Sequence, residues 1–231
     1  MKFSKIKTYL MIGVCFLLTI QLLACGVLID DNQMAPPPPP VPRFKLNKVA
    51  VLPFEIPFQA DNPPRTARCP ISGTLFTPGP VKPGQAVVMS NSLMSRLAGR
   101  TAYQIIPPEH VEGIKAGIMS YEAKTSPLVL VQEVGKALNA DAVLVCYLFR
   151  FQERVGTTLA AESPASVAFI LNMVRTSNGE IIWQRVFDET QQSLSENVLN
   201  LQAFFQRGVK WLTAEELAQA GLDHTLKNLP Q

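Results

Sequence analysis

The residue whose type and position most suggest a chemical reaction is Cys25. It follows the small residue Ala24, behind an uncharged apolar run over residues 9–20, and three lysines lie within the first seven residues. A basic start, an apolar stretch and a small residue at the cut are the order of a secretory signal. The sequence therefore predicts that residues 1–24 are a cleaved signal peptide and that the rest of the chain is exported.

An uncleaved membrane anchor is the alternative. Residues 11–29 are nearly as long as the roughly 20 apolar residues that span a bilayer. However, Gln21 interrupts the run, and Asp30 and Asp31 follow it without a basic flank. A cytoplasmic exit favours such a flank, so the cleaved signal is the preferred interpretation.

Beyond this segment the residues that could catalyse a reaction are scattered. His110 and His224 lie in no motif with a mechanism, and Cys69-Pro-Ile-Ser72 is only half of a Cys-x-x-Cys, which supplies neither a zinc site nor a dithiol. The carboxylates could act on a glycan only if two of them met in a cleft; they are Glu153, Glu162, Asp188, Glu189 and Glu196. We therefore expect a non-catalytic binding or assembly protein without metal or cofactor, and a cell-wall or glycan hydrolase is a distant alternative.

Charge and cysteine content depend on the cleavage. Loss of the three lysines lowers the formal charge of +3 to 0, so the mature chain has no basic signal for nucleic acid. Cys69 and Cys146 then remain besides Cys25. An exported chain could pair them, but Cys146 lies within an apolar strand, and the sequence leaves the disulfide open.

The proline content divides the mature chain into two parts. Pro36 to Pro40 are consecutive and Pro42 follows, which favours an extended polyproline segment and excludes a packed element. The prediction is a tether over residues 25–47 and a single domain over residues 48–231.

Within the domain, strands are expected at residues 48–54, 101–106 and 141–151, and helices at residues 85–98 and 109–116 and after Ser126. Capping boxes beginning at Ser193 and Thr213 predict two further helices. The proline-rich residues 61–84 have little periodicity and are expected to be functional or mobile. This order predicts an α/β domain of two or three layers, with helices packed on a mixed sheet that ends in an antiparallel meander.

The meander contains the clearest local signal. Asn178-Gly179 between two apolar runs predicts a type I′ hairpin turn, which would place Val174 opposite Trp183. One face would then belong to the core. The other would form a candidate partner surface of Asn172, Val174, Trp183 and Arg185.

Two resemblances add to these inferences. Leu22-Leu23-Ala24-Cys25 resembles the bacterial lipobox, which implies diacylglycerol on the Cys25 sulfur, cleavage before Cys25 and acylation of the new N-terminus. Gly26 rather than aspartate after the cysteine implies sorting to the outer membrane. Several acyl chains give stable membrane attachment, whereas one chain binds marginally.

The wider arrangement resembles the family that contains the penicillin-binding-protein activator LpoB, the curli secretion lipoprotein CsgG and the N-terminal domain of TolB. Besides the lipobox, the resemblance is carried by residues 36–42, 49–54, 140–145 and 179–183. It implies a TolB N-terminal-domain-like fold facing the periplasm and an accessory or regulatory role on another envelope protein, such as a cell-wall synthase. A self-oligomeric, CsgG-like secretion channel is the alternative, but no pair of long alternating segments could supply its barrel strands.

Overall fold

The computed structural model describes residues 45–121, 126–157, 161–191 and 211–230, which belong to one compact unit over residues 45–231. The predicted signal peptide, Cys25, most of the predicted tether and the helix expected from Ser193 lie outside the described residues. Among the described helices, none is both long and apolar enough to cross a membrane.

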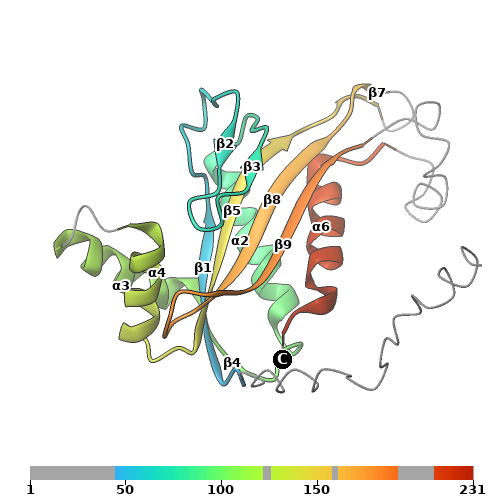
Figure 1. Cartoon of the computed structure of the whole chain (residues 1–231). Helices are drawn as coiled ribbons and strands as arrows, with labels where there is room; N and C mark the ends of the chain where they lie inside the picture. The colour runs from blue at the N-terminus through green and yellow to red at the C-terminus, as the bar shows by residue number, and fades with distance from the viewer. Residues whose placement is uncertain (1–44, 122–125, 158–160, 192–210, 231) are drawn as a thin grey trace, which may run out of the picture. The chain divides into compact units, whose positions relative to one another are not determined.

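A five-stranded mixed sheet with the strand order β4-β1-β5-β8-β9 forms the centre of the unit (Figure 1). The strands β1 (Lys48–Glu55), β4 (Gln104–Ile106) and β5 (Ala142–Gln152) are parallel. β8 (Ser166–Arg175) and β9 (Ile181–Thr190) continue the sheet in antiparallel order. The predicted fold class, α/β with a mixed sheet ending in an antiparallel meander, is confirmed.

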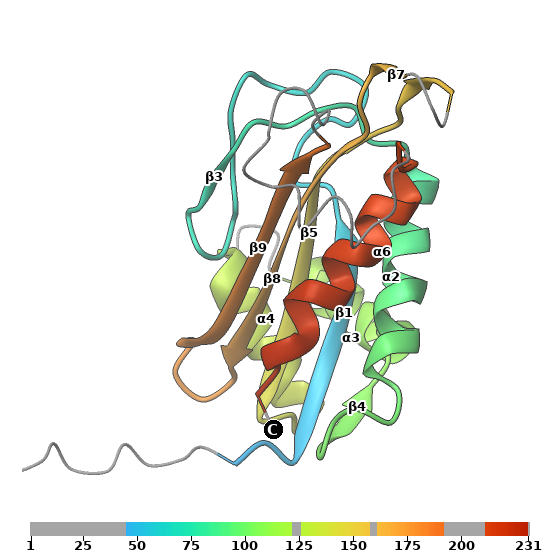
Figure 2. The ribbon, with the colours of Figure 1, turned by 90° about the vertical axis from the view of Figure 1, so that its right-hand side faces the viewer.

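Helices cover both faces of the sheet, which makes three layers (Figure 2). The α2/α6 face lies under α2 (Pro83–Leu97), α6 (Ala214–Thr225) and the 3-10 turn Leu226–Asn228. The α3/α4 face lies under α3 (Pro108–Tyr121), α4 (Pro127–Ala137) and an excursion that contains the short strands β2 (Ala67–Arg68) and β3 (Leu75–Phe76). A small separate pair, β6 (Val155–Gly156) and β7 (Ala161–Ser163), follows β5.

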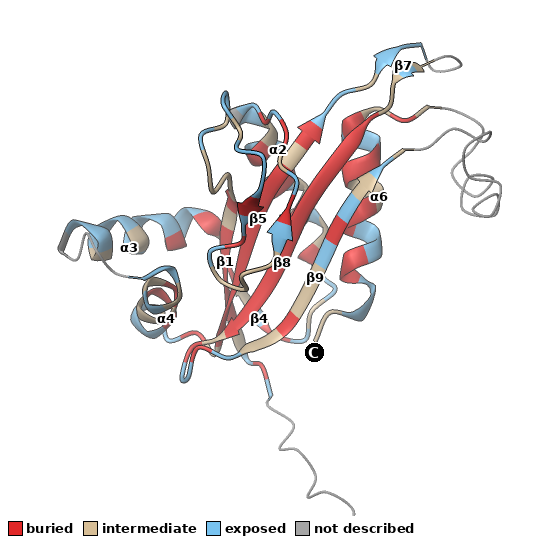
Figure 3. Cartoon of the chain, turned by 45° about the horizontal axis from the view of Figure 1, so that its top comes forward, coloured by how far each residue is buried: buried red, intermediate tan, exposed pale blue. Residues whose placement is uncertain are grey.

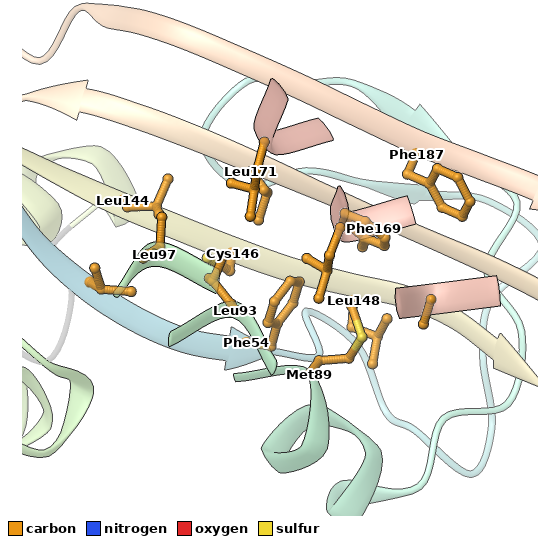
Figure 4. Close-up of a cluster of buried hydrophobic side chains, with 14 of the residues drawn as sticks. Phe54, Met89, Leu93, Leu97, Leu144, Cys146, Leu148, Phe169, Leu171 and Phe187 are labelled. Atoms are coloured by element: carbon orange, nitrogen blue, oxygen red, sulfur yellow. The ribbon is translucent and has the colours of Figure 1, made fainter. Parts of the chain in front are cut away.

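The largest core lies between the sheet and the α2/α6 layer (Figure 4). Phe169 stands at its centre, with its ring centroid 5.8 Å from that of Phe54 and 5.1 Å from that of Phe187. Residues of α2 at helical spacing, Met89, Leu93 and Leu97, belong to the same buried cluster. Each such side chain stabilises the fold by about 1.5–3 kcal/mol. In Figure 3 buried residues occupy most of β5 and β8, as expected for strands covered on both faces.

Two helix starts follow the predicted capping chemistry. Ser126 Oγ accepts a hydrogen bond from Val129 N at 3.4 Å, with Pro127 at the first helical position. Thr213 and Glu216 form a reciprocal capping box, with bonds of 3.1 and 2.9 Å between each side chain and the other backbone amide. Helix α3 is longer than the predicted 109–116.

The chain enters β1 through a side-chain clamp. Asp141 Oδ2 accepts hydrogen bonds from the backbone amides of Asn47 and Lys48, at 2.7 and 2.9 Å. The Lys48 ammonium donates to the carbonyl of Leu138 at 3.2 Å. These bonds tie the start of β1 to the start of β5 before the two strands pair.

The hairpin differs from the predicted type I′ turn. Such a turn needs positive φ at both central residues, whereas only Gly179 has it, with φ +73°. The loop closes with Gly179 N donating to Arg175 O at 2.9 Å and Arg175 N donating to Glu180 O at 2.8 Å. A bulge places Val174 opposite Ile181 and Met173 opposite Trp183, so the predicted register is wrong by one residue.

A candidate binding site at the carboxyl end of β1

The partner surface expected on the hairpin does not form. Asn172 and Val174 are completely buried under the α3/α4 layer, whereas Trp183 and Arg185 point to the other face of the sheet. Trp183 is 7% exposed and its Nε1 donates to Asn228 O at 2.9 Å. The half-buried Arg185 has its guanidinium carbon 5.5 Å from the Trp183 ring centroid. A one-residue change of register exchanges the faces of a strand, which explains why the prediction was wrong.

The two remaining cysteines are free thiols. Cys146 lies in the core of the α2/α6 face and Cys69 in that of the α3/α4 face, so the sheet separates them. Asn172 Nδ2 lies 3.7 Å from Cys69 Sγ. Burial, and secondarily the charge of Glu55, raise the pKa of the Cys146 thiol. Both cysteines are therefore packing residues in this structure.

The residues considered for catalysis do not converge. His110 and His224 are exposed on two different helices. Glu153 accepts from Ala214 N at 3.1 Å at the start of α6, and Asp188 pairs with Arg150. Among the described residues, no group of three or more histidine, cysteine or acidic side chains could hold a metal ion. Glu196 lies outside the described residues.

The proline-rich residues 61–84 pack against the sheet. Arg150 of β5 fastens them through its Nη1, which donates to Thr77 O at 2.6 Å, and its Nε donates to Ser166 Oγ of β8 at 2.6 Å. Gly79 N donates to Phe149 O at 2.9 Å. Burial of Ala67, Cys69 and Phe76 in the core of the α3/α4 face gives the segment a structural role.

A different place has the geometry of a binding site: the carboxyl end of β1. Glu55, the last residue of β1, lines two cavities at once. The first has a volume of about 380 Å³ and lies between α2 and α3; its apolar residues include Phe54, Ile56, Ala86, Val87 and Met94. The second has a volume of about 280 Å³ and lies between α3 and α4; its apolar residues include Leu52, Met119, Leu130, Val131 and Val134.

The topology explains why the cavities occur here. The connection that leaves β1 passes through the excursion on the α3/α4 face and then through α2 on the other face. The connection that leaves β4 runs through α3 and α4. The helices therefore diverge above the end of β1. In open sheets with parallel strands, ligands bind at such a divergence, outside the carboxyl ends of the strands.

The charged groups of the site are partly neutralised. Glu55 forms an ion pair with Lys115 of α3, and their side chains are 35% and 20% exposed. Tyr147 of β5, the neighbour of Glu55 in the sheet, also lines the second cavity. Burial raises its pKa above the usual value, and the charge of Glu55 adds to this. A neutral phenol beside a carboxylate held by an ammonium is suited to binding and supplies no activated base.

Exposed large apolar side chains lie on the helices that border this site, and two of them, Val87 and Met119, line its cavities. In the part of the chain that the structure describes, eight such residues are exposed, and five of them lie on the three helices that border the cavities. The five are Val87, Val88, Ile114, Met119 and Val129.

Sequence reasoning missed this site because its residues come from five separate elements. Residues 55, 87, 112, 130 and 147 share no spacing that a local pattern would show. One signal was present: residues 48–54 were predicted as a buried strand, and the end of such a strand in an α/β fold is a known place for ligands.

Comparisons with known proteins give structural matches alone. No family model and no curated protein matches the chain. A PelC dodecamer from Paraburkholderia phytofirmans matches with 15% identity over 82% of this chain and 91% of that chain, at a TM-score of 0.40. The LpoB C-terminal domain from Salmonella enterica matches with 12% identity over 64% and 86%, at 0.37. A hypothetical protein from Chlamydia trachomatis matches with 13% identity over 80% and 96%, at 0.44.

LpoB, a member of the family that the sequence resembles, is thus among these solved structures, at 12% identity. These similarities carry no argument about the function of the site, which rests on the geometry above.

Proposed function

We propose that this chain is a non-catalytic, lipid-anchored accessory protein of the bacterial cell envelope that binds another envelope protein. In this proposal, residues 1–24 are removed and Cys25 carries the acyl chains in the outer membrane. Residues 25–47 are the tether, and the domain of residues 48–231 faces the periplasm. The proposal is supported by the lipobox-like Leu22 to Cys25, by Gly26 after it and by the proline run.

One observation carries the binding role: an exposed apolar side chain lines each of the two cavities that meet at Glu55. Val87 is 59% exposed on α2, and Met119 is 50% exposed on α3. Each square ångström of apolar surface left in water costs about 25 cal/mol. A partner that covers these side chains would recover that free energy, and the cavities would accept its protruding side chains.

The first test is the native mass of the full-length, membrane-derived protein in mild detergent, with crosslinked partners identified. We expect one or two copies that carry another envelope protein. Replacing Val87 and Met119 by aspartate should release that protein. The same change at Leu75 and Val155, which are exposed apolar residues outside the site, should leave it bound. A large ring of identical chains would refute the accessory role and indicate the subunit of an oligomeric secretion channel.

A further inference from the structure

We infer that the partner reaches the carboxyl end of β1 with a cationic segment, in which a lysine or arginine is flanked by apolar residues. This inference rests on the proposed function, because it assigns the chemistry of the partner to the site described above. It follows from the charges of the cavity, from the arrangement of its apolar walls and from the ion pair already present there.

The cavity between α2 and α3 is acidic. Glu55, Glu109 and Glu112 line it together, and none of its lining residues is basic. Glu109 lies in the first turn of α3, where a negative charge is favoured by the helix dipole. Glu112 is exposed, and no hydrogen bond or ion pair with another described residue uses it. Glu109 thus helps to stabilise α3, whereas the carboxylate of Glu112 is left to bind a partner.

A cation already occupies part of the site. The Lys115 ammonium binds Glu55 from the side of the second cavity. Lys115 lines this second cavity and does not line the acidic one. This pair shows that an ammonium fits against the end of β1. The approach to Glu55 from the side of α2, next to Glu112, is left to a basic side chain from outside.

The apolar walls on both sides of Glu55 determine which residues should flank the cation in the partner's segment. Val87 and Met94 of α2 line the first cavity, and Met119 of α3 and Leu130 of α4 line the second. A chain that crosses the end of β1 would place apolar side chains in both cavities and the side chain between them above Glu55. The pattern apolar–basic–apolar is therefore complementary to the site.

Charge also excludes other segments. Lys115 already compensates the charge of Glu55, but a partner without a cation would bury Glu112 away from water with no compensating charge, which is costly. An acidic segment would add repulsion between like charges. The carboxylates would thus favour a basic segment over neutral and acidic ones.

Photo-crosslinking with the full-length protein in its own membrane tests the inference. The photoreactive residue replaces Val87 or Met119, and Leu75 or Val155 in the controls. The crosslinked segment of the partner is then sequenced. We expect a segment of another envelope protein in which lysine or arginine is flanked by apolar residues, with low yield at the control positions.

A charge reversal tests the electrostatic part. Glu112→Lys should lower the crosslinking yield from Val87 about tenfold, and added salt should lower the yield of the unmodified protein. Glu162→Lys, an equal change at an exposed position on β7, should leave the yield unchanged. An unchanged melting temperature of Glu112→Lys shows that the fold survives.

The outcomes separate the two proposals. A crosslinked segment without lysine or arginine, or a yield that Glu112→Lys does not change, would overturn the cationic partner and leave the accessory role standing. Crosslinks only to a second copy of this chain, or none at Val87 and Met119, would overturn both.

Discussion

Phe76 stacks on Phe149, with ring centroids 4.0 Å apart and ring planes 10° apart. The contact joins the excursion between β1 and α2 to the middle of β5, next to the bonds that Arg150 makes with Thr77 and Ser166. Offset aromatic pairs add stabilisation beyond their buried area. A segment expected to be functional or mobile is thereby part of the hydrophobic core.

Phe76→Ala should lower the free energy of unfolding by about 3 kcal/mol or more, because it removes a buried ring and leaves a cavity. Leu75→Ala, at the neighbouring residue with 58% exposure, should cost less than about 0.5 kcal/mol. Urea unfolding of both variants checks this. Similar losses for the two would show that the excursion does not belong to the core.

Gly135→Ala should destabilise the protein although alanine is the better helix former. A Cβ at Gly135 would lie 2.4 Å from Thr176 Oγ1 and 3.0 Å from Val143 Cγ2. Overpacking of this kind costs about 1–3 kcal/mol. Gly113→Ala on α3 meets nothing within 4 Å and should stabilise by about 0.5–1 kcal/mol. Calorimetry should therefore show that the two substitutions shift the melting temperature in opposite directions.

Alkaline pH should destabilise the fold through its buried tyrosines. Burial raises the pKa of Tyr103 to about 12 from 10.0. Below pH 10 the phenol is neutral in both states, and between pH 10 and 12 the unfolded chain alone loses the proton. The free energy of unfolding then falls by at most about 1.4 kcal/mol per pH unit for this group.

Urea unfolding at pH 9 and pH 11 checks this with Tyr103→Phe as the matched variant. The variant should lose less stability than the unmodified protein over that interval. Equal losses would show that Tyr103 ionises normally in the folded state.

The thiols of Cys69 and Cys146 should both react with a disulfide reagent only after unfolding. Both are buried and unpaired, and the raised pKa of Cys146 further lowers its thiolate fraction. The mature protein should give no reaction at pH 8 when folded and two thiols per chain in denaturant without reductant. A count of zero in denaturant would mean that the two are oxidised.

Cys25→Ala should yield an unprocessed precursor that is not retained as a mature outer-membrane lipoprotein, because the acyl chains would have no attachment point. Fractionation and the mass of the N-terminal peptide check this. Normal processing and membrane retention in the variant would contradict lipidation at Cys25.

Local patterns predicted most elements because each depends on neighbouring residues. The unalternating apolar run from Lys48, the Ser126-Pro127 start and the Thr213 capping box all form as predicted. The register of the hairpin was predicted wrongly because a bulge near Ile182 shifts it by one residue, and the Asn178-Gly179 pair does not reveal this bulge. The approach of Glu55, Lys115 and Tyr147 depends on strand order and helix crossing, which local spacing does not contain.

The Asp141 clamp at the start of β1 has a mechanical consequence. With Cys25 held in a membrane as proposed, a pull on the domain would be transmitted to β1, which lies between β4 and β5 and runs parallel to both. The ladder bonds of β1 would then be strained together in shear, and the bonds of Asp141 to Asn47 and Lys48 would take the force first. In the proposed arrangement the domain would be attached through a strand that is paired on both sides, and the same strand ends at Glu55.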